Sequence, residues 1–271
     1  MPFRIPPPLT HLEYDWLDST IGQYLMAKEQ SLYDNAVADL FGFNALQMGS
    51  ARMGLLSSSR IPNRYRASEF VRDTPDNHVY CSDDFLPFAD GSLDLLLLPH
   101  RLEFSERPHQ TLREAERVIM PEGHLLISGF NPLSLWGLES SISKLLKRTP
   151  SYPWHGNFIG LARVKDWLTL LGFEVVSVNL GCNMPPFEHA HWYKKFECWE
   201  EFSERYCAFI GGIYFIVAKK RVPGMTRLKP VWKTPTIPSR LIVRPSQSSP
   251  TQFAPTQPEA VKPKEDNGKE E

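Results

Sequence analysis

The side chain best placed to do chemistry is His100. It follows Leu98 and Pro99 at the end of an apolar run, where a parallel sheet presents the carboxyl edge at which a doubly wound fold usually binds its ligand. Histidine titrates near neutral pH, so His100 could act as a general base toward an incoming nucleophile. The same position also suits a polar residue that is only hydrogen-bonded at the mouth of a site. Both interpretations stay open at the level of the sequence.

The elements around His100 follow from the hydrophobic pattern and the turn residues. Residues 93–98, LDLLLL, have no helical period and are bounded by turn signals, which is typical of a strand buried on both faces of a parallel sheet. Pro108 suits the first turn of a helix, and apolar residues then recur at helical spacing up to Pro121. A second apolar run, 125–127, predicts another strand. Strand, helix and strand in this order predict a right-handed parallel crossover.

Short motifs follow one another in a fixed order between Cys81 and Asn131. They are Leu86-Pro87-Phe88, Asp90-Gly91-Ser92-Leu93-Asp94, Leu112-Arg113-Glu114, Arg117-Val118 and Pro121-Glu122-Gly123. This segment resembles the core of class I S-adenosylmethionine-dependent methyltransferases, in particular the type-11 branch related to quinone and small-molecule methyltransferases. The resemblance implies an α/β fold: a doubly wound, Rossmann-like sheet with strand order 3-2-1-4-5-7-6, an antiparallel last strand and flanking helices.

The resemblance also implies that the cofactor is S-adenosyl-L-methionine and that the turn after the first strand helps to hold it. The family usually has an acidic residue there, then an apolar residue and alternating glycines that let the backbone approach the cofactor. Gln47 stands in the position of the acid, and Gly49 matches the first glycine. Ala51 replaces the second glycine. A glutamine can still accept and donate hydrogen bonds, so these three residues are expected to contact the cofactor. The alternative is an ordinary strand-to-helix turn in a relative that has given up the cofactor.

Further cofactor contacts are implied at the ends of the next strands. The residues concerned are Glu69, Ser82, Asp83, Pro99 and His100. In the family an acid after the second strand receives both ribose hydroxyls, which matches Glu69, with Asp73 behind it if the register slips. The position that faces the adenine amino group aligns with Ser82, and Asp83 is the nearest carboxylate. An acid at a strand end can instead be a solvated charge or a helix cap.

The chain is predicted to form one methyltransferase-like domain, residues 1–223, followed by a mostly disordered tail at 224–271 that is rich in proline and polar residues. The parts expected within the domain are an N-terminal helix at 20–41, a core at 43–131, a lid or acceptor insertion at 129–160 and the last strands within 173–220. Thr20 and Gln23 have the spacing of a capping box at the start of the N-terminal helix, and Gly42 is expected to end that helix.

The composition limits the classes of partner. A formal net charge of −1 gives no global attraction to nucleic acid or to an anionic membrane. The cysteines, which are Cys81, Cys182, Cys198 and Cys207, have no metal-ligand spacing, so reduced thiols and no bound metal are expected. No stretch approaches the ~20 apolar residues of a membrane span, and the proline-rich start is not a secretory signal. A soluble, cytoplasmic protein with a small-molecule acceptor is therefore expected.

Two functions fit these observations. The first is an enzyme that transfers the methyl group of the cofactor to a small or medium-sized acceptor by in-line displacement. The protein then contributes positioning and desolvation rather than a short catalytic motif. The second is a catalytically silent binding or regulatory module, which Gln47, Ala51 and Glu122 favour because the family usually has other residues there. A nicotinamide-dependent oxidoreductase is disfavoured, because no G-x-G-x-x-G follows a strand.

Overall fold

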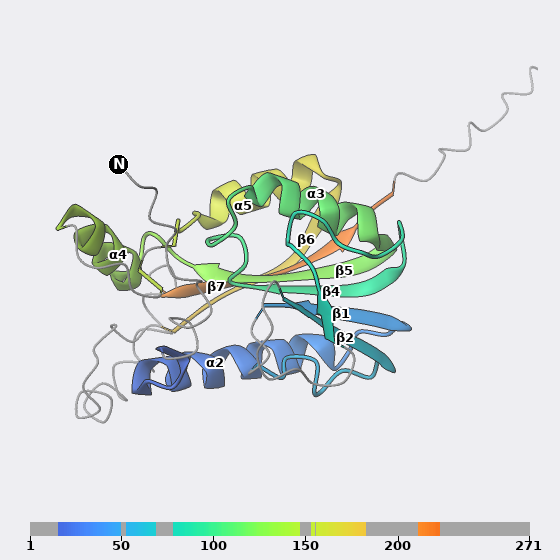
Figure 1. Cartoon of the computed structure of the whole chain (residues 1–271), viewed down its shortest axis with the longest axis horizontal. Helices are drawn as coiled ribbons and strands as arrows, with labels where there is room; N and C mark the ends of the chain where they lie inside the picture. Colours follow the sequence, from blue (N-terminus) through green and yellow to red (C-terminus); the bar gives the residue numbers. More distant parts are fainter. Residues whose placement is uncertain are drawn as a thin grey trace, which may run out of the picture. The chain divides into compact units, whose positions relative to one another are not determined.

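The sheet has seven strands in the order β3-β2-β1-β4-β5-β7-β6. The strands are β1 (Asn44–Met48), β2 (Asn63–Ser68), β3 (His78–Tyr80), β4 (Leu93–Pro99), β5 (Ile119–Phe130), β6 (Phe173–Gly181) and β7 (Ile213–Lys220). β1 to β5 pair in parallel, whereas β7 runs antiparallel to both β5 and β6. The predicted Rossmann-like methyltransferase sheet with an antiparallel last strand is confirmed (Figure 1).

The computed structural model describes residues 16–49, 53–68, 78–146, 153–154, 156–182 and 211–222. The chain divides into two compact units, Met1–Gly224 and Met225–Glu271, and every described residue belongs to the first unit. The predicted tail and the candidate site residues Ala51 and Glu69 lie outside the described residues. No helix in the described ranges is long and apolar enough to cross a membrane.

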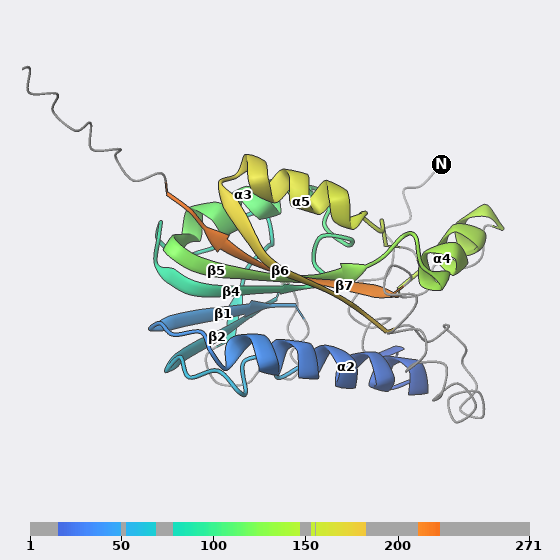
Figure 2. The ribbon, with the colours of Figure 1, turned by 180° about the vertical axis from the view of Figure 1, so that it is seen from behind.

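Helices cover both faces of the sheet. One face carries α2 (Thr20–Val37), and the other carries α3 (Pro108–Val118) and α5 (Leu161–Leu170), as Figures 1 and 2 show from opposite sides. Another helix, α4 (Leu135–Leu145), follows β5 and lies beyond its carboxyl end rather than over the sheet. The two faces therefore need separate apolar cores.

The leucine run of β4 supplies both cores. Leu96 and Leu98 belong to the cluster that packs with α3 and α5, whereas Leu95 and Leu97 belong to the cluster that packs with α2. Successive side chains of a strand point to opposite faces, so an uninterrupted apolar run fits a strand with cover on both sides. Each of these leucines is at most 1% exposed. The interpretation of residues 93–98 as a strand buried on both faces is confirmed.

The start of α2 differs from the prediction by one residue. The capping residue is Ser19, whose Oγ accepts a hydrogen bond from Gly22 N at 3.1 Å, and Thr20 is the first residue of the helix. Gln23 does not complete a capping box, because its side-chain amide donates to the Asp18 carbonyl oxygen at 3.3 Å. Serine in place of threonine at the cap satisfies the same unpaired backbone N–H groups.

The end of α2 also differs. The helix stops at Val37, so the predicted range 20–41 is too long, and Gly42 is not its exit residue. A Cβ at Gly42 would lie 2.3 Å from the Cβ of Asp94, so the glycine allows the chain to approach that side chain. The Asp94 carboxylate then accepts hydrogen bonds from the backbone N–H groups of Phe43 and Asn44, each at 2.9 Å. These bonds attach the start of β1 to β4.

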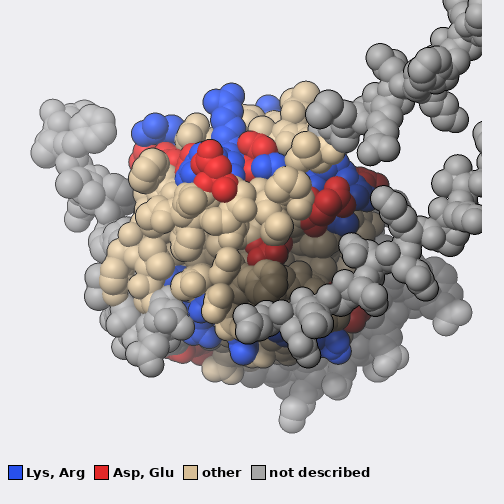
Figure 3. All heavy atoms as spheres, turned by 90° about the vertical axis from the view of Figure 1, so that its right-hand side faces the viewer, with Lys and Arg blue, Asp and Glu red and all other residues tan. Residues whose placement is uncertain are grey.

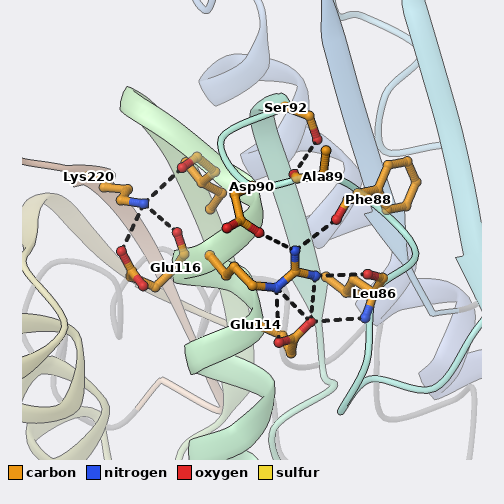
Figure 4. Close-up of polar contacts among 10 residues, drawn as sticks. Leu86, Phe88, Ala89, Asp90, Ser92, Glu114, Glu116 and Lys220 are labelled. Carbon is orange, nitrogen blue, oxygen red and sulfur yellow. Dashed lines mark hydrogen bonds and ion pairs between the residues drawn. The ribbon is translucent and has the colours of Figure 1, made fainter.

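The motifs that carry the family resemblance hold the loop before β4 against α3. Arg117, near the end of α3, donates hydrogen bonds to the carbonyl oxygens of Leu86 and Phe88, each at 2.9 Å. It also pairs with the carboxylates of Glu114 and Asp90, at 2.8 and 2.6 Å. Glu114 in turn accepts a hydrogen bond from Leu86 N at 3.1 Å. Figure 4 shows these contacts converging, and we call this group the Arg117 clamp.

The Arg117 clamp lies at the amino edge of the parallel strands. Figure 3 views this side of the molecule and shows basic and acidic side chains interspersed. Ion pairs between side chains of opposite sign include Lys219 with Glu122 at 2.9 Å and Lys220 with Glu116 at 2.8 Å. Charges that alternate in sign do not create the one-sided field that concentrates a charged ligand. The candidate site is therefore sought at the opposite, carboxyl edge of the sheet.

Candidate functional site

Gly49 follows β1 directly and has a φ of +96°, in the left-handed region that favours glycine. A Cβ at this position would lie 3.2 Å from Arg101 Cδ and 3.6 Å from the carbonyl oxygen of Pro99. The backbone conformation therefore favours glycine, and a side chain here would also crowd Arg101. The sequence places the first glycine of the cofactor turn at this position.

Gln47 is a buried residue of β1 whose carboxamide closes the turn that follows. Its Nε2 donates a hydrogen bond to the Met53 carbonyl oxygen, and its Oε1 accepts one from Leu55 N at 3.2 Å. A carboxylate could accept the second bond but could not donate the first. The turn is thus built for an amide rather than for the acid that is usual in the family.

Asp83 and Arg101 form an ion pair at the carboxyl edge of the sheet. The Asp83 side chain is 6% exposed, and its Oδ2 accepts hydrogen bonds from Arg101 Nε at 2.8 Å and Nη2 at 2.5 Å. The neighbouring Ser82 is exposed, and its Oγ is 3.5 Å from Asp84 N. The residues proposed for the adenine end, Ser82 and Asp83, thus lie near an arginine whose side chain approaches the position of Gly49.

His100 follows β4 in a left-handed backbone conformation, with a φ of +49°. Its backbone N donates to the Ser128 carbonyl oxygen at 3.0 Å, which keeps it in the ladder with β5. Its ring packs against Phe130, with 4.2 Å between the ring centroids. A non-glycine residue with this φ is uncommon, and such residues are found at sites where the surroundings over-determine the backbone.

Two buried carboxylates hold the His100 ring. Nε2 is 2.8 Å from Glu29 Oε1, and Nδ1 is 3.3 Å from Glu103 Oε1. Glu29 reaches the ring from α2, while Glu103 comes from the loop after β4 and also accepts a hydrogen bond from Phe130 N at 2.5 Å. All three side chains are less than a tenth exposed. We call Glu29, His100 and Glu103 the His100 cluster.

The charges of the His100 cluster determine its protonation. Burial alone lowers the pKa of the His100 imidazole, but the Glu29 and Glu103 carboxylates outweigh it and raise that pKa to about 10. The imidazole is therefore a cation at neutral pH. Each ring nitrogen then donates its proton to a carboxylate. In this arrangement His100 has no lone pair with which to accept a proton from an acceptor molecule.

Several polar atoms of this region have no hydrogen-bond partner within the described part of the chain. They are Glu29 Oε2, Glu103 Oε2 and the hydroxyl of Tyr214. Burial and the Glu103 charge raise the pKa of Tyr214, so its hydroxyl keeps its proton. Tyr33 is a second buried phenol, and it donates to Ser128 Oγ at 3.2 Å. Unpaired buried oxygens beside a charged group are uncommon in folded proteins and mark places where a ligand or a water adds partners.

Sequence reasoning missed three members of this site: Glu29, Glu103 and Arg101. The Glu103 side chain is buried and bonded to Phe130 and His100, and nothing in its local sequence distinguishes it from a solvated loop charge. A signal for Glu29 was available. It occupies a four-residue spacing with Leu25 and Tyr33, so it falls on the buried face of α2, where an unpaired carboxylate would not be tolerated.

Comparison with known proteins agrees with this geometry. Residues 63–127 match the sequence profile of the type-11 methyltransferase domain family. Among solved structures, an S-adenosylmethionine-dependent methyltransferase from Thermotoga maritima superposes with a TM-score of 0.52 at 17% identity, covering 78% of this chain and 99% of that one. At that identity the likeness concerns the fold alone.

Curated relatives match parts of the chain. An uncharacterized protein of Escherichia coli (strain K12), YafS, is 37% identical over 141 residues, which cover 52% of this chain and 54% of the relative. A malonyl-[acyl-carrier protein] O-methyltransferase of Coxiella burnetii is 37% identical over 89 residues, which cover 32% of this chain and 29% of that protein. The aligned regions thus span about half or less of these relatives. The matched segment, residues 63–127, is thus similar to the type-11 branch of class I S-adenosylmethionine-dependent methyltransferases.

Proposed function

We propose that the protein is an S-adenosylmethionine-dependent methyltransferase that acts on a small or medium-sized acceptor. The observation that carries the proposal is Gly49. It lies at the carboxyl end of β1, at the point where the strand order reverses, and its positive φ favours glycine. A backbone without a side chain at this point is what a cofactor turn needs in order to approach its ligand.

The residues around Gly49 fit such a cofactor. Asp83 is a buried carboxylate at the end of β3 and would accept hydrogen bonds from the adenine end, next to Ser82. Glu69 is the proposed acid for the ribose hydroxyls. Gln47, Ala51 and Pro99 would line the turn and the strand end. When bound, the cofactor supplies an electrophilic methyl group, and the protein's own residues orient the two reactants and exclude water.

The His100 cluster is the proposed acceptor side of the site. At neutral pH the imidazolium is saturated by two carboxylates, so His100 positions the cluster rather than removing a proton. Glu29 Oε2 and Glu103 Oε2 have lone pairs and no described partner, but they are buried, so an acceptor hydroxyl or amine would have to enter the cluster in order to donate to them. His100 thus has a positioning role, and the two glutamates make the polar contact with the acceptor.

A second candidate function is the catalytically silent module. The observation that favours it is the ion pair between Arg101 and Asp83, which lies beside Gly49. The Gln47 carboxamide also bonds to the backbone of its own turn, and this position has no carboxylate that could bind a ligand. If these contacts persist in solution, the turn has only a structural role and no cofactor binds there.

Equilibrium binding of S-adenosylhomocysteine by isothermal titration calorimetry separates the two functions. The enzyme predicts saturable binding that Gly49→Ala weakens strongly, because the new Cβ is strained at φ +96° and crowds the site. Gly54→Ala is the matched control, since the nearest atom to its Cβ is 3.7 Å away. The silent module predicts no heat of binding at millimolar ligand. A Gly49→Ala protein that is folded by circular dichroism and binds normally would also exclude the proposed turn.

A further inference from the structure

A pocket lies between the second half of α2 and the strand β6, and we call it the α2–β6 pocket. It has a volume of about 310 Å³, and its floor is the neighbouring strand β7. Among the described strands β6 pairs only with β7, so β6 is the edge of the sheet on this side. Small-molecule sites have volumes of about 300–1,000 Å³, so the α2–β6 pocket is large enough for one small ring.

The helix wall of the pocket is one side of α2. Leu32 and Ala36 are four positions apart, and Asn35 and Asp39 repeat this spacing beside them. Residues four apart lie on the same side of a helix. The C-cap residue of α2 still has helical backbone angles, so Asp39 continues that side just after the helix ends. The two apolar side chains are half-buried, whereas the two polar ones are exposed.

The opposite wall of the pocket is a face of β6. Ser177 and Asn179 are two positions apart, so their side chains point to the same side of the strand, and both are exposed. In the ladder with β7 they lie opposite Val217 and Phe215, which form the floor. The Phe215 ring is 1% exposed and packs edge-on against Tyr33 of α2, with 4.8 Å between the ring centroids. The core beneath the pocket therefore holds the two walls apart.

The polar side chains of both walls can bond to a ligand. The hydrogen bonds and ion pairs of the described residues leave these side chains unused: Asn35, Asp39, Ser177 and Asn179. The carboxamides and the hydroxyl can both donate and accept, whereas the carboxylate only accepts. No described lysine or arginine lines the pocket, so an anion would have no counter-charge. A cation would gain little, because the single carboxylate is exposed. A neutral ligand whose groups both donate and accept therefore fits best.

We propose that the α2–β6 pocket binds a neutral ring that carries several hydroxyl groups and has the size of a single sugar unit. A hydroxyl both donates and accepts, as do the carboxamides of Asn35 and Asn179 and the hydroxyl of Ser177. The C–H side of such a ring is apolar and can rest on Leu32 and Ala36. In the sheet β4 and β5 separate β7 from β1, so this ligand does not compete with a cofactor at the turn after β1. The inference is independent of the proposed enzymatic activity.

Proton–nitrogen correlation NMR of the full chain, titrated separately with D-glucose, D-galactose and D-mannose, tests the proposal. We expect at least one sugar to cause saturable shifts of the Asn35 and Asn179 carboxamide signals and of the Ser177 backbone amide. The dissociation constant should be on the order of 1 mM, because the polar groups are solvated before binding. The double variant Asn35→Ala/Asn179→Ala should bind about tenfold more weakly, since each wall loses a hydrogen-bonding group. The matched control is Asn157→Ala, because Asn157 is an exposed asparagine outside the pocket, and it should keep the affinity.

The opposite outcomes overturn the proposal. Absence of shifts with all three sugars at about 50 mM would exclude a site for a sugar-sized ring. An unchanged affinity in Asn35→Ala/Asn179→Ala, or an equal loss in Asn157→Ala, would place the binding outside the pocket. Glucosamine has an ammonium group in place of one hydroxyl, and binding of glucosamine alone that is lost in Asp39→Asn would mean a site for cations. All substituted positions are exposed, so the variants should unfold at the same temperature as the parent protein.

Discussion

Arg101 Nε and Nη2 both donate to Asp83 Oδ2, at 2.8 and 2.5 Å. Arg101 comes from the segment after β4 and Asp83 from the segment after β3, and β1 and β2 lie between those strands in the sheet. The arginine therefore crosses the carboxyl edge of the sheet, and its Cδ lies next to Gly49. In this arrangement the ion pair covers the place proposed for the adenosine part of the cofactor.

Removing the arginine should make that place easier to occupy. We expect Arg101→Ala to raise the affinity for S-adenosylhomocysteine about three- to tenfold, since binding no longer has to break a partly buried ion pair with a net strength on the order of 1 kcal/mol. Calorimetric titration measures the change. A lower affinity in Arg101→Ala would contradict this expectation and would show that the arginine contacts the ligand directly.

The control for Arg101 is Arg107. Its Nε is 3.5 Å from Asp84 Oδ2, and its side chain is 71% exposed, so this pair belongs to the same loop region but lies in solvent. Arg107→Ala should leave the affinity unchanged. A similar gain in both variants would indicate a general effect of net charge rather than release of Asp83.

The stability of the fold should depend on pH through the His100 cluster. The pKa of His100 is raised from its ordinary value of 6.5 to about 10, because the charges of Glu29 and Glu103 outweigh the effect of burial. The native state then binds more protons than the unfolded state between these two values. The stabilisation is complete below about pH 6.5 and is lost as the pH rises toward 10, with a slope of up to about 1.4 kcal/mol per pH unit.

Glu29→Gln isolates this effect. The variant keeps the shape of the side chain but removes one of the two charges that raise the pKa of His100. The loss of unfolding free energy with rising pH should therefore be complete at a lower pH. Urea unfolding at a series of pH values gives the free energy of unfolding for both proteins. His109→Gln is the control, because His109 packs against Trp167 and is not part of the His100 cluster. If Glu29→Gln and the parent chain lose stability over the same pH range, Glu29 does not hold the imidazolium.

Arg117 should matter for folding and not for ligand binding. Arg117→Ala removes hydrogen bonds to two carbonyl oxygens and two carboxylates, and should lower the free energy of unfolding by about 2–3 kcal/mol. Arg113→Ala, on an exposed position of the same helix, should change it by less than about 0.5 kcal/mol. Chemical denaturation measures both. The affinity of the folded Arg117→Ala protein for S-adenosylhomocysteine should stay that of the parent, and a loss of affinity at full folding would connect the clamp to the site.

Glu69 is the proposed acid for the ribose hydroxyls, and Glu69→Gln tests it. Loss of two charge-assisted hydrogen bonds, each contributing about 1.5–3 kcal/mol, should weaken the affinity at least tenfold while the domain stays folded. Asp73→Asn is the paired variant. Full affinity in Glu69→Gln together with lost affinity in Asp73→Asn would move the ribose acid to Asp73 and shift the predicted register of this segment.

The sheet could be predicted because its determinants are local. Residues 93–98 form a leucine run that only a doubly covered strand accommodates, and the motifs around it set the strand order through the family resemblance. The boundaries of α2 were less predictable, because Ser19 and Thr20 are adjacent and chemically equivalent as caps. Small differences in cap geometry decide between them.

The His100 cluster could not be predicted, because its contacts are distant along the chain. Glu29 and His100 are separated by 71 positions, and nothing in either local sequence specifies the other. The same holds for Asp83 and Arg101, which are 18 positions apart and belong to different loops. Patterns of hydrophobicity specify which face of an element is buried, but they do not specify which polar groups meet across two layers.

The position of the Arg117 clamp has a consequence for how proteins of this kind are recognised. The clamp lies at the amino end of β4 and His100 lies at the carboxyl end, roughly 20 Å apart at about 3.3 Å per residue. Substitutions at the carboxyl end that abolish catalysis leave the motif residues of the Arg117 clamp at the amino end unchanged. A motif search of this region therefore detects a chain that can build the sheet, and it would score an inactive descendant as highly as a working enzyme.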